Sequence, residues 1–208
     1  MKKLFAVCCI VTSFLFMGCL TTNTTFGTEK QTQGNLVVSY DEFLERTTVD
    51  MKNDNIVNFK CSDVFKSFSI YPYFIYTDKQ IDYRLVFRIS GDTSKFENII
   101  FITENGKYSF SFSSEKQKTG MLIPDNHYSA YVEGDYRITE EQYKILGEII
   151  NSANLKAAVY TIDNTVLEIL EYGERAKNTY KELNDYLEEN NLSELSNDYE
   201  TEISIIKK

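Results

Sequence analysis

Few side chains in this protein are of the types that catalyse reactions or bind metal ions. Four cysteines occur, and His127 is the single histidine. Cys8 and Cys9 lie in an apolar run at the N-terminus, which leaves Cys19, Cys61 and His127 as candidates for chemistry. One histidine and one cysteine in the folded part cannot supply the four ligands of a structural zinc site. The sequence also has no calcium loop of the Asp-x-Asp-x-Asp-Gly type and no glycine-rich phosphate loop, so we expect no metal and no cofactor.

A catalytic dyad of Cys61 and His127 is conceivable, because a thiol beside an imidazole forms a nucleophile–base pair. Neither residue has a catalytic signature around it, and no Gly-x-Ser-x-Gly elbow occurs. Cys61 follows Phe59 in a stretch that alternates apolar and polar residues, which is typical of a buried thiol. We therefore expect no enzymatic activity. A hydrolase or an inhibitor with a convergent site is the alternative.

The N-terminus has the organisation of a secretory signal peptide. Lys2 and Lys3 form a short basic region, and residues 4–17 form an apolar run. This run is shorter than the roughly 20 residues that span a bilayer. Gly18 then places a small residue directly before the thiol of Cys19. The pattern predicts a leader over residues 1–18.

The residues around this cleavage site resemble the lipobox of bacterial lipoproteins, in the relaxed form found in spirochaetes: Leu15-Phe16-Met17-Gly18-Cys19. Phe16 stands where the usual motif has leucine, and Met17 is bulkier than the usual residue. The resemblance implies that the leader is removed, that Cys19 carries acyl chains of the palmitate type, and that the protein is anchored to a membrane of the bacterial cell envelope. It covers residues 1–19 alone and so implies location, not activity.

After Cys19 the sequence is polar. Residues 20–35 are rich in Thr, Asn, Gln and Gly, and we expect residues 19–35 to form the lipidated cysteine and a flexible tether. The net charge of −9 becomes −11 once Lys2 and Lys3 leave with the leader. This excess of negative charge repels phosphate backbones, so nucleic acid is not an expected partner.

Strand patterns dominate the first part of the folded region. Asp82–Ser90 alternates between apolar and polar residues, and Asn105-Gly106 predicts a two-residue hairpin turn that pairs Phe101 with Phe110. Phe68–Thr77 is apolar on both faces but contains Pro72, so we expect an edge or bulged strand there.

Two helices are expected in the second part. Thr139 and Gln142 form a capping box that starts a helix over residues 139–153, and a second amphipathic helix covers about residues 173–190. A hairpin around Asp163-Asn164 lies between them. Residues 36–192 are therefore interpreted as one α+β domain, with a mainly antiparallel sheet or a small sandwich. Residues 193–208 form a frayed tail or an edge strand.

The most distinctive candidate for binding is a tyrosine-rich strand. Tyr71, Tyr73 and Tyr76 could contact a peptide that adds to this strand's edge. We therefore expect a non-catalytic, lipid-anchored module that binds a protein or a small ligand. A structural or assembly component of the envelope is the second hypothesis.

Overall fold

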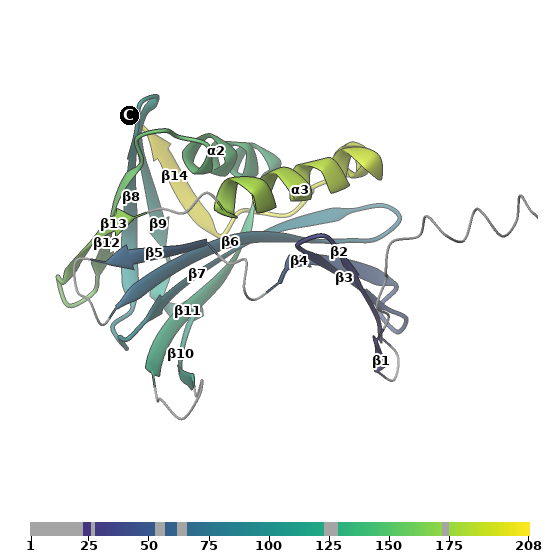
Figure 1. The fold of residues 1–208 in the computed structure, drawn as a ribbon, viewed down its shortest axis with the longest axis horizontal. Coiled ribbons are helices and arrows are strands. Elements are labelled where there is room, and N and C mark those ends of the chain that lie inside the picture. The colour runs from purple at the N-terminus through teal and green to yellow at the C-terminus, as the bar shows by residue number, and fades with distance from the viewer. Residues whose placement is uncertain (1–22, 26–27, 53–56, 62–65, 123–128, 172–174) are drawn as a thin grey trace, which may run out of the picture.

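The computed structural model describes residues 23–25, 28–52, 57–61, 66–122, 129–171 and 175–208. Within these residues the fold is mainly antiparallel sheet with α-helices packed on it, which confirms the α+β class (Figure 1). The strands of the N-terminal half are β1 Asn23–Thr25, β2 Thr28–Gln33, β3 Leu36–Asp41, β4 Arg46–Met51, β5 Val57–Cys61, β6 Ser67–Tyr76, β7 Ile81–Ser90 and β8 Phe96–Thr103. The remaining strands are β9 Gly106–Phe112, β10 Gln117–Leu122, β11 Ser129–Ile138, β12 Lys156–Thr161, β13 Val166–Glu171 and β14 Ile203–Lys207.

The sheet branches at β6. Along one edge β6 pairs with β7 over its whole length. Along the other edge its first half pairs with β5 and its last residues pair with β4. From β5 the sheet continues through β13, β12, β8 and β9 to β14, whereas from β4 it continues through β3 and β2 to β1. We call strands β1–β4 the wing, and Figure 1 shows it extending away from the rest of the sheet.

Residues 68–77 were expected to form an edge or a bulged strand. The edge alternative is wrong, because β6 is paired on both sides. The position of Pro72 explains how this central strand tolerates a proline. Residues 71–73 pair with β7 but fall between the segments that pair with β5 and with β4. Within the described residues no strand pairs with Pro72 on that edge, and unpaired positions of this kind are where sheets accept proline.

The core lies between the sheet and the helices, and it is unusually aromatic. α2 Glu140–Ile150 and α3 Arg175–Glu189 lie over the same side of β6 in Figure 1, within the two ranges expected for helices. The capping box of α2 is present, with Thr139 and Gln142 in reciprocal hydrogen bonds. The sheet curls until β14 approaches β11, where the Glu202 N–H donates to the Arg137 carbonyl at 3.0 Å. Phe87 on β7 lies at the centre of this enclosure and is fully buried.

The β8–β9 hairpin keeps its expected faces but not its expected register. Phe101 lies opposite Tyr108, and the turn is centred on Glu104 and Asn105. The carboxylate of Glu104 accepts hydrogen bonds from the Ser152 hydroxyl at 2.5 Å and the Ala153 N–H at 3.1 Å. These contacts hold Glu104 in the turn, where it cannot form a cross-strand pair. The register changes by an even number of residues, so the same side chains still point inward.

The β12–β13 hairpin differs from expectation by one residue. Its loop has three residues, because the Thr161 N–H donates to the Thr165 carbonyl at 3.0 Å and Asn164 adopts a left-handed φ of 64°. Three-residue loops with a left-handed residue are a common hairpin type. A two-residue turn at Asp163-Asn164 would place Tyr160 opposite Leu167, whereas the three-residue loop places it opposite Val166. A change of one residue exchanges the faces of a strand, so Tyr160 and Val166 both point outward.

The N-terminal end of the folded region differs from expectation, and the C-terminal end matches one of the two expected alternatives. Residues 28–33 form β2 and residues 23–25 form β1, so most of the segment expected as a flexible tether is paired strand. At the C-terminal end, residues 203–207 form β14 at the edge of the sheet, which favours an edge strand over a frayed tail. The wing is fastened to α3 where the Asn35 N–H and amide donate to the Glu182 carboxylate at 2.8 and 2.5 Å.

Candidate functional site

The sheet has two outward surfaces of opposite character, and the first is covered by charged side chains that pair with one another. It lies on β6, β7 and β11. Arg84 contacts Asp135 at 3.1 Å, Arg88 pairs with Glu133, and the Tyr73 hydroxyl donates to Asp135 at 2.8 Å. Long paired side chains of this kind cover the strands beneath them, so most of the charged groups on this surface have partners within the fold.

Burial changes the ionisation of groups on this surface. It raises the pKa of Asp82, an effect that Arg84 and Arg137 oppose. Burial also raises the pKa of Tyr73, and the negative charge of the neighbouring Asp135 carboxylate raises this pKa further. A tyrosine hydroxyl with a raised pKa stays protonated near neutral pH and acts as a hydrogen-bond donor. The cluster is therefore a set of ion pairs in which one buried oxygen, Oδ1 of Asp82, has no hydrogen-bond partner.

The three tyrosines expected to form a binding surface do not share one. Tyr71 and Tyr73 lie on the charged outward side of β6, opposite Val86 and Arg84 of β7. Tyr76 lies on the other side, where its hydroxyl is 3.1 Å from that of Tyr186 on α3. β6 offers no continuous free edge, so a peptide cannot extend the sheet there as the sequence suggested.

The second outward surface lies on β13, β12, β8, β9 and β14. Its exposed apolar side chains gather on β8, β12 and β13, and Ile206 of β14 is set apart from them by Ser109 of β9. Strand alternation sends Ile99, Phe101 and Val159 into the core, and their neighbours point outward with no helix over them. We define the apolar face by its outward side chains and their exposed fractions: Ile102 at 46%, Tyr160 at 38%, Val166 at 45%, Ile206 at 50%, and the half-buried Ile100.

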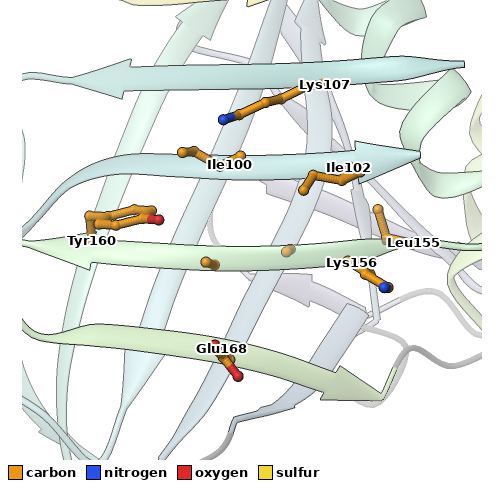
Figure 2. A pocket seen from close by; sticks show the side chains of 9 residues that line it. Ile100, Ile102, Lys107, Leu155, Lys156, Tyr160 and Glu168 are labelled. Atoms are coloured by element: carbon orange, nitrogen blue, oxygen red, sulfur yellow. The ribbon is translucent and has the colours of Figure 1, made fainter. Parts of the chain in front are cut away.

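A shallow trough of about 570 Å³ lies along the apolar face (Figure 2). Ile100 and Ile102 of β8 form its floor with Ala157 and Ala158 of β12, and Tyr160 stands at one end. A second hollow of similar volume shares Ile100 and Tyr160 with the first, so the two are continuous along the strands.

Charged groups border the trough at defined positions. Ile102 is in register with Lys107 on one side and with Lys156 on the other, so two ammonium groups flank it. Glu168 of β13 lies opposite Ala158. Figure 2 shows the Lys107 side chain extending over the sheet toward Ile100. The trough thus combines an apolar floor with positive charge at the end nearest Ile102, an arrangement suited to binding rather than to acid–base catalysis.

Sequence reasoning missed the apolar face because it assigned β8 a single buried side. The signal was present in the run Ile99-Ile100-Phe101-Ile102, which is apolar on both faces of the strand. Such runs normally indicate a strand covered on both sides. Here one side has no cover within the described residues.

The predictions about the cysteines and the histidine fall on side chains outside the described structure. Cys19 and His127 lie outside the described residues. The backbone of Cys61 lies in β5 and pairs with Ile169 of β13, and its side chain is likewise outside the description. Among the described residues there is no group of three or more His, Cys, Asp or Glu side chains arranged to hold a metal ion.

Comparisons with known proteins identify no relative of this chain. In the parts of the chain that are described, no helix combines the length and the apolar character needed to cross a membrane. A scan against protein-family models finds no matching family, and searches of curated proteins and of solved structures find no match.

Proposed function

We propose that this protein is a lipid-anchored, non-catalytic binding module of the bacterial cell envelope, held by acyl chains on Cys19. The apolar face binds a partner protein. The observation that carries the binding role is the trough, whose large apolar side chains, Ile100 and Ile102 of β8 and Tyr160 of β12, have no helix over them within the described residues. Contiguous exposed apolar surface of this kind marks interaction sites in soluble domains.

The anchor rests on the N-terminal sequence. A basic start, a short apolar run and Gly18 before Cys19 form a cleavable leader of the lipoprotein type. One acyl chain binds a membrane marginally, whereas two or three hold stably. The anchor fixes the folded domain at a membrane surface and leaves its apolar face available.

The geometry of the trough favours a protein over a small molecule. Sites for small ligands bury most of the ligand's surface in a concave pocket. Here Ile102 remains 46% exposed and Tyr160 38% exposed, so the surface is open. Lys107 and Lys156 flank Ile102, so the partner surface that fits best presents apolar side chains beside carboxylates.

Removing the anchor tests the location. We expect Cys19→Ala to shift the protein from the detergent phase to the aqueous phase almost completely in a phase-partition experiment, because no acyl chain is added. Mass spectrometry of the unaltered protein checks the same point, with a diacylglyceryl adduct on Cys19 as the expected result. Unchanged partition of the variant, or an intact leader on the natural protein, would contradict the anchor.

Photocrosslinking tests the apolar face. We expect a photoreactive residue at Ile102 to give one discrete adduct with an envelope protein in the cells that make this chain. Tyr160→Asp should abolish the adduct, because it places a charge in the trough. The same probe at Lys144, whose side chain is 70% exposed on α2, is the matched control and should give no such adduct. Identical adducts at both positions, or none at Ile102, would show that the face does not bind a protein.

A further inference from the structure

A second exposed apolar feature lies at the opposite side of the fold, on the wing. The turn between β3 and β4, residues 42–45, carries two adjacent large apolar side chains. Phe43 is 74% exposed and Leu44 is 56% exposed, which makes them the most exposed of their kind on this part of the fold. We call residues 42–45 the hairpin tip. Two such side chains side by side at the end of a hairpin have nothing to bury against within the described wing.

The hairpin tip is held in one conformation. The Asp41 carboxylate accepts hydrogen bonds from the N–H groups of Phe43 and Leu44, at 3.0 and 3.1 Å. Glu45 takes a left-handed φ of 46°, which closes the turn onto Arg46. The backbone is therefore ordered before anything binds, and the two side chains project without further loss of conformational freedom.

The anchoring cysteine is close to the hairpin tip along the chain. Three residues separate Cys19 from Asn23, the first residue of β1. A chain extends by at most about 3.6 Å per residue, so Cys19 lies within about 14 Å of Asn23. Strand register places Asn23 beside Lys30, and Lys30 beside Ser39, two residues before Asp41 at the base of the tip. Acyl chains on Cys19 therefore keep the tip within reach of the membrane surface.

We infer that the hairpin tip is a second membrane contact, in which Phe43 and Leu44 enter the interfacial region of the bilayer that holds the acyl chains. This inference rests on the proposed lipidation of Cys19. Glu42 and Glu45 flank the two apolar side chains, so the matching surface is uncharged, zwitterionic lipid rather than anionic lipid. Two contacts fix the orientation of the domain, where the anchor alone would leave it free to rotate.

The absence of tryptophan from the chain provides a direct test. Phe43→Trp introduces a single reporter at an exposed position where the larger ring has room. The acylated variant is reconstituted into phosphatidylcholine vesicles whose acyl chains carry bromine, which quenches tryptophan on contact. Tyr160→Trp on the apolar face is the matched control. We expect a blue shift and loss of emission for Phe43→Trp, and neither change for Tyr160→Trp.

Flotation of the vesicles separates the two proposals. If both variants float and Phe43→Trp is quenched alone, the tip contacts lipid. If both float but Phe43→Trp keeps its emission, the anchor stands and the tip contact is overturned. Quenching of Tyr160→Trp alone would show that the opposite side of the fold lies on the bilayer and would equally overturn the contact. Failure to float would overturn the anchor, and the tip contact with it.

Discussion

Replacing Phe87 by alanine is expected to destabilise the fold by about 3–5 kcal/mol, the range found for removal of a buried phenylalanine ring. Phe87 is fully buried, and its ring centroid lies 4.6 Å from that of Phe112 and 5.9 Å from that of Phe68. These rings belong to β6, β7 and β9, so one side chain joins distant parts of the sheet. The alanine variant loses this apolar contact and leaves a cavity that neighbouring strands cannot close.

Urea denaturation followed by circular dichroism measures this effect. Phe43→Ala is the matched control, because it removes the same ring from a position that is 74% exposed, and its stability in the absence of lipid should change by less than about 0.5 kcal/mol. Since whole domains are stable by only about 5–15 kcal/mol, Phe87→Leu provides a milder second variant that should remain folded. Equal midpoints for Phe87→Ala and Phe43→Ala would show that the core is not organised around this ring.

Replacing Gln117 by leucine is expected to cost about 2–6 kcal/mol, because two buried backbone groups each lose a partner worth about 1–3 kcal/mol. The Phe96 N–H donates to Oε1 of Gln117 at 2.9 Å, and Nε2 of Gln117 donates to the Phe96 carbonyl at 2.6 Å. Gln117 is 5% exposed. Its amide thus takes the place of a neighbouring strand at the start of β8, and leucine has a similar size but no polar atoms.

The same denaturation experiment checks this prediction. Gln31→Leu, at an exposed position of β2, is the control for the chemical change and should be close to neutral. Gln117→Asn tests whether the length of the side chain matters as well as its polar amide, because the shorter amide cannot contact both atoms of Phe96. We expect it to be destabilised as well. A Gln117→Leu variant as stable as Gln31→Leu would mean that water satisfies Phe96 and that the amide is dispensable.

Patterns within single strands predicted the faces of the sheet correctly. Tyr83, Leu85 and Phe87 point into the core and Arg84 and Arg88 point away from it, as alternation requires. The capping box at Thr139 also marked the start of α2 correctly. These features depend on neighbours within a few residues, which is why local sequence carries them.

Register and branching depend on partners that are distant in the sequence. The Glu104 carboxylate is held by Ser152 at the end of α2, which no local pattern around Asn105-Gly106 reveals. The three-residue loop at Asn164 needs a left-handed residue that asparagine adopts readily, yet the same dipeptide also fits a two-residue turn. Pro72 was interpreted as a mark of an edge strand, because the gap between β4 and β5 is a property of the whole sheet.

The candidate site was predicted less well than the fold. Tyrosines drew attention to β6, where they are engaged with Asp135 and Tyr186, whereas the exposed apolar side chains lie on β8 and β12. Ile100 and Ile102 fall on the side of β8 that was expected to be polar, because Ser109 and Ser111 of the neighbouring strand share that side. Within the described residues no layer covers this side of β8 and β12. That is a property of the tertiary structure, which the sequence of a single strand does not reveal.

The branch at β6 also determines how the protein carries mechanical load. A pull on the N-terminal end enters the sheet through β1 and must pass strand by strand along the wing before it reaches β6. β4 joins β6 through three residue pairs, Thr47–Tyr76 to Val49–Phe74, and the Asn35–Glu182 clasp adds one tie to α3. Short antiparallel pairings pulled from one end separate one pair at a time. Under such a pull we therefore expect the wing to be loaded before β8 and β12, which lie on the other branch of the sheet.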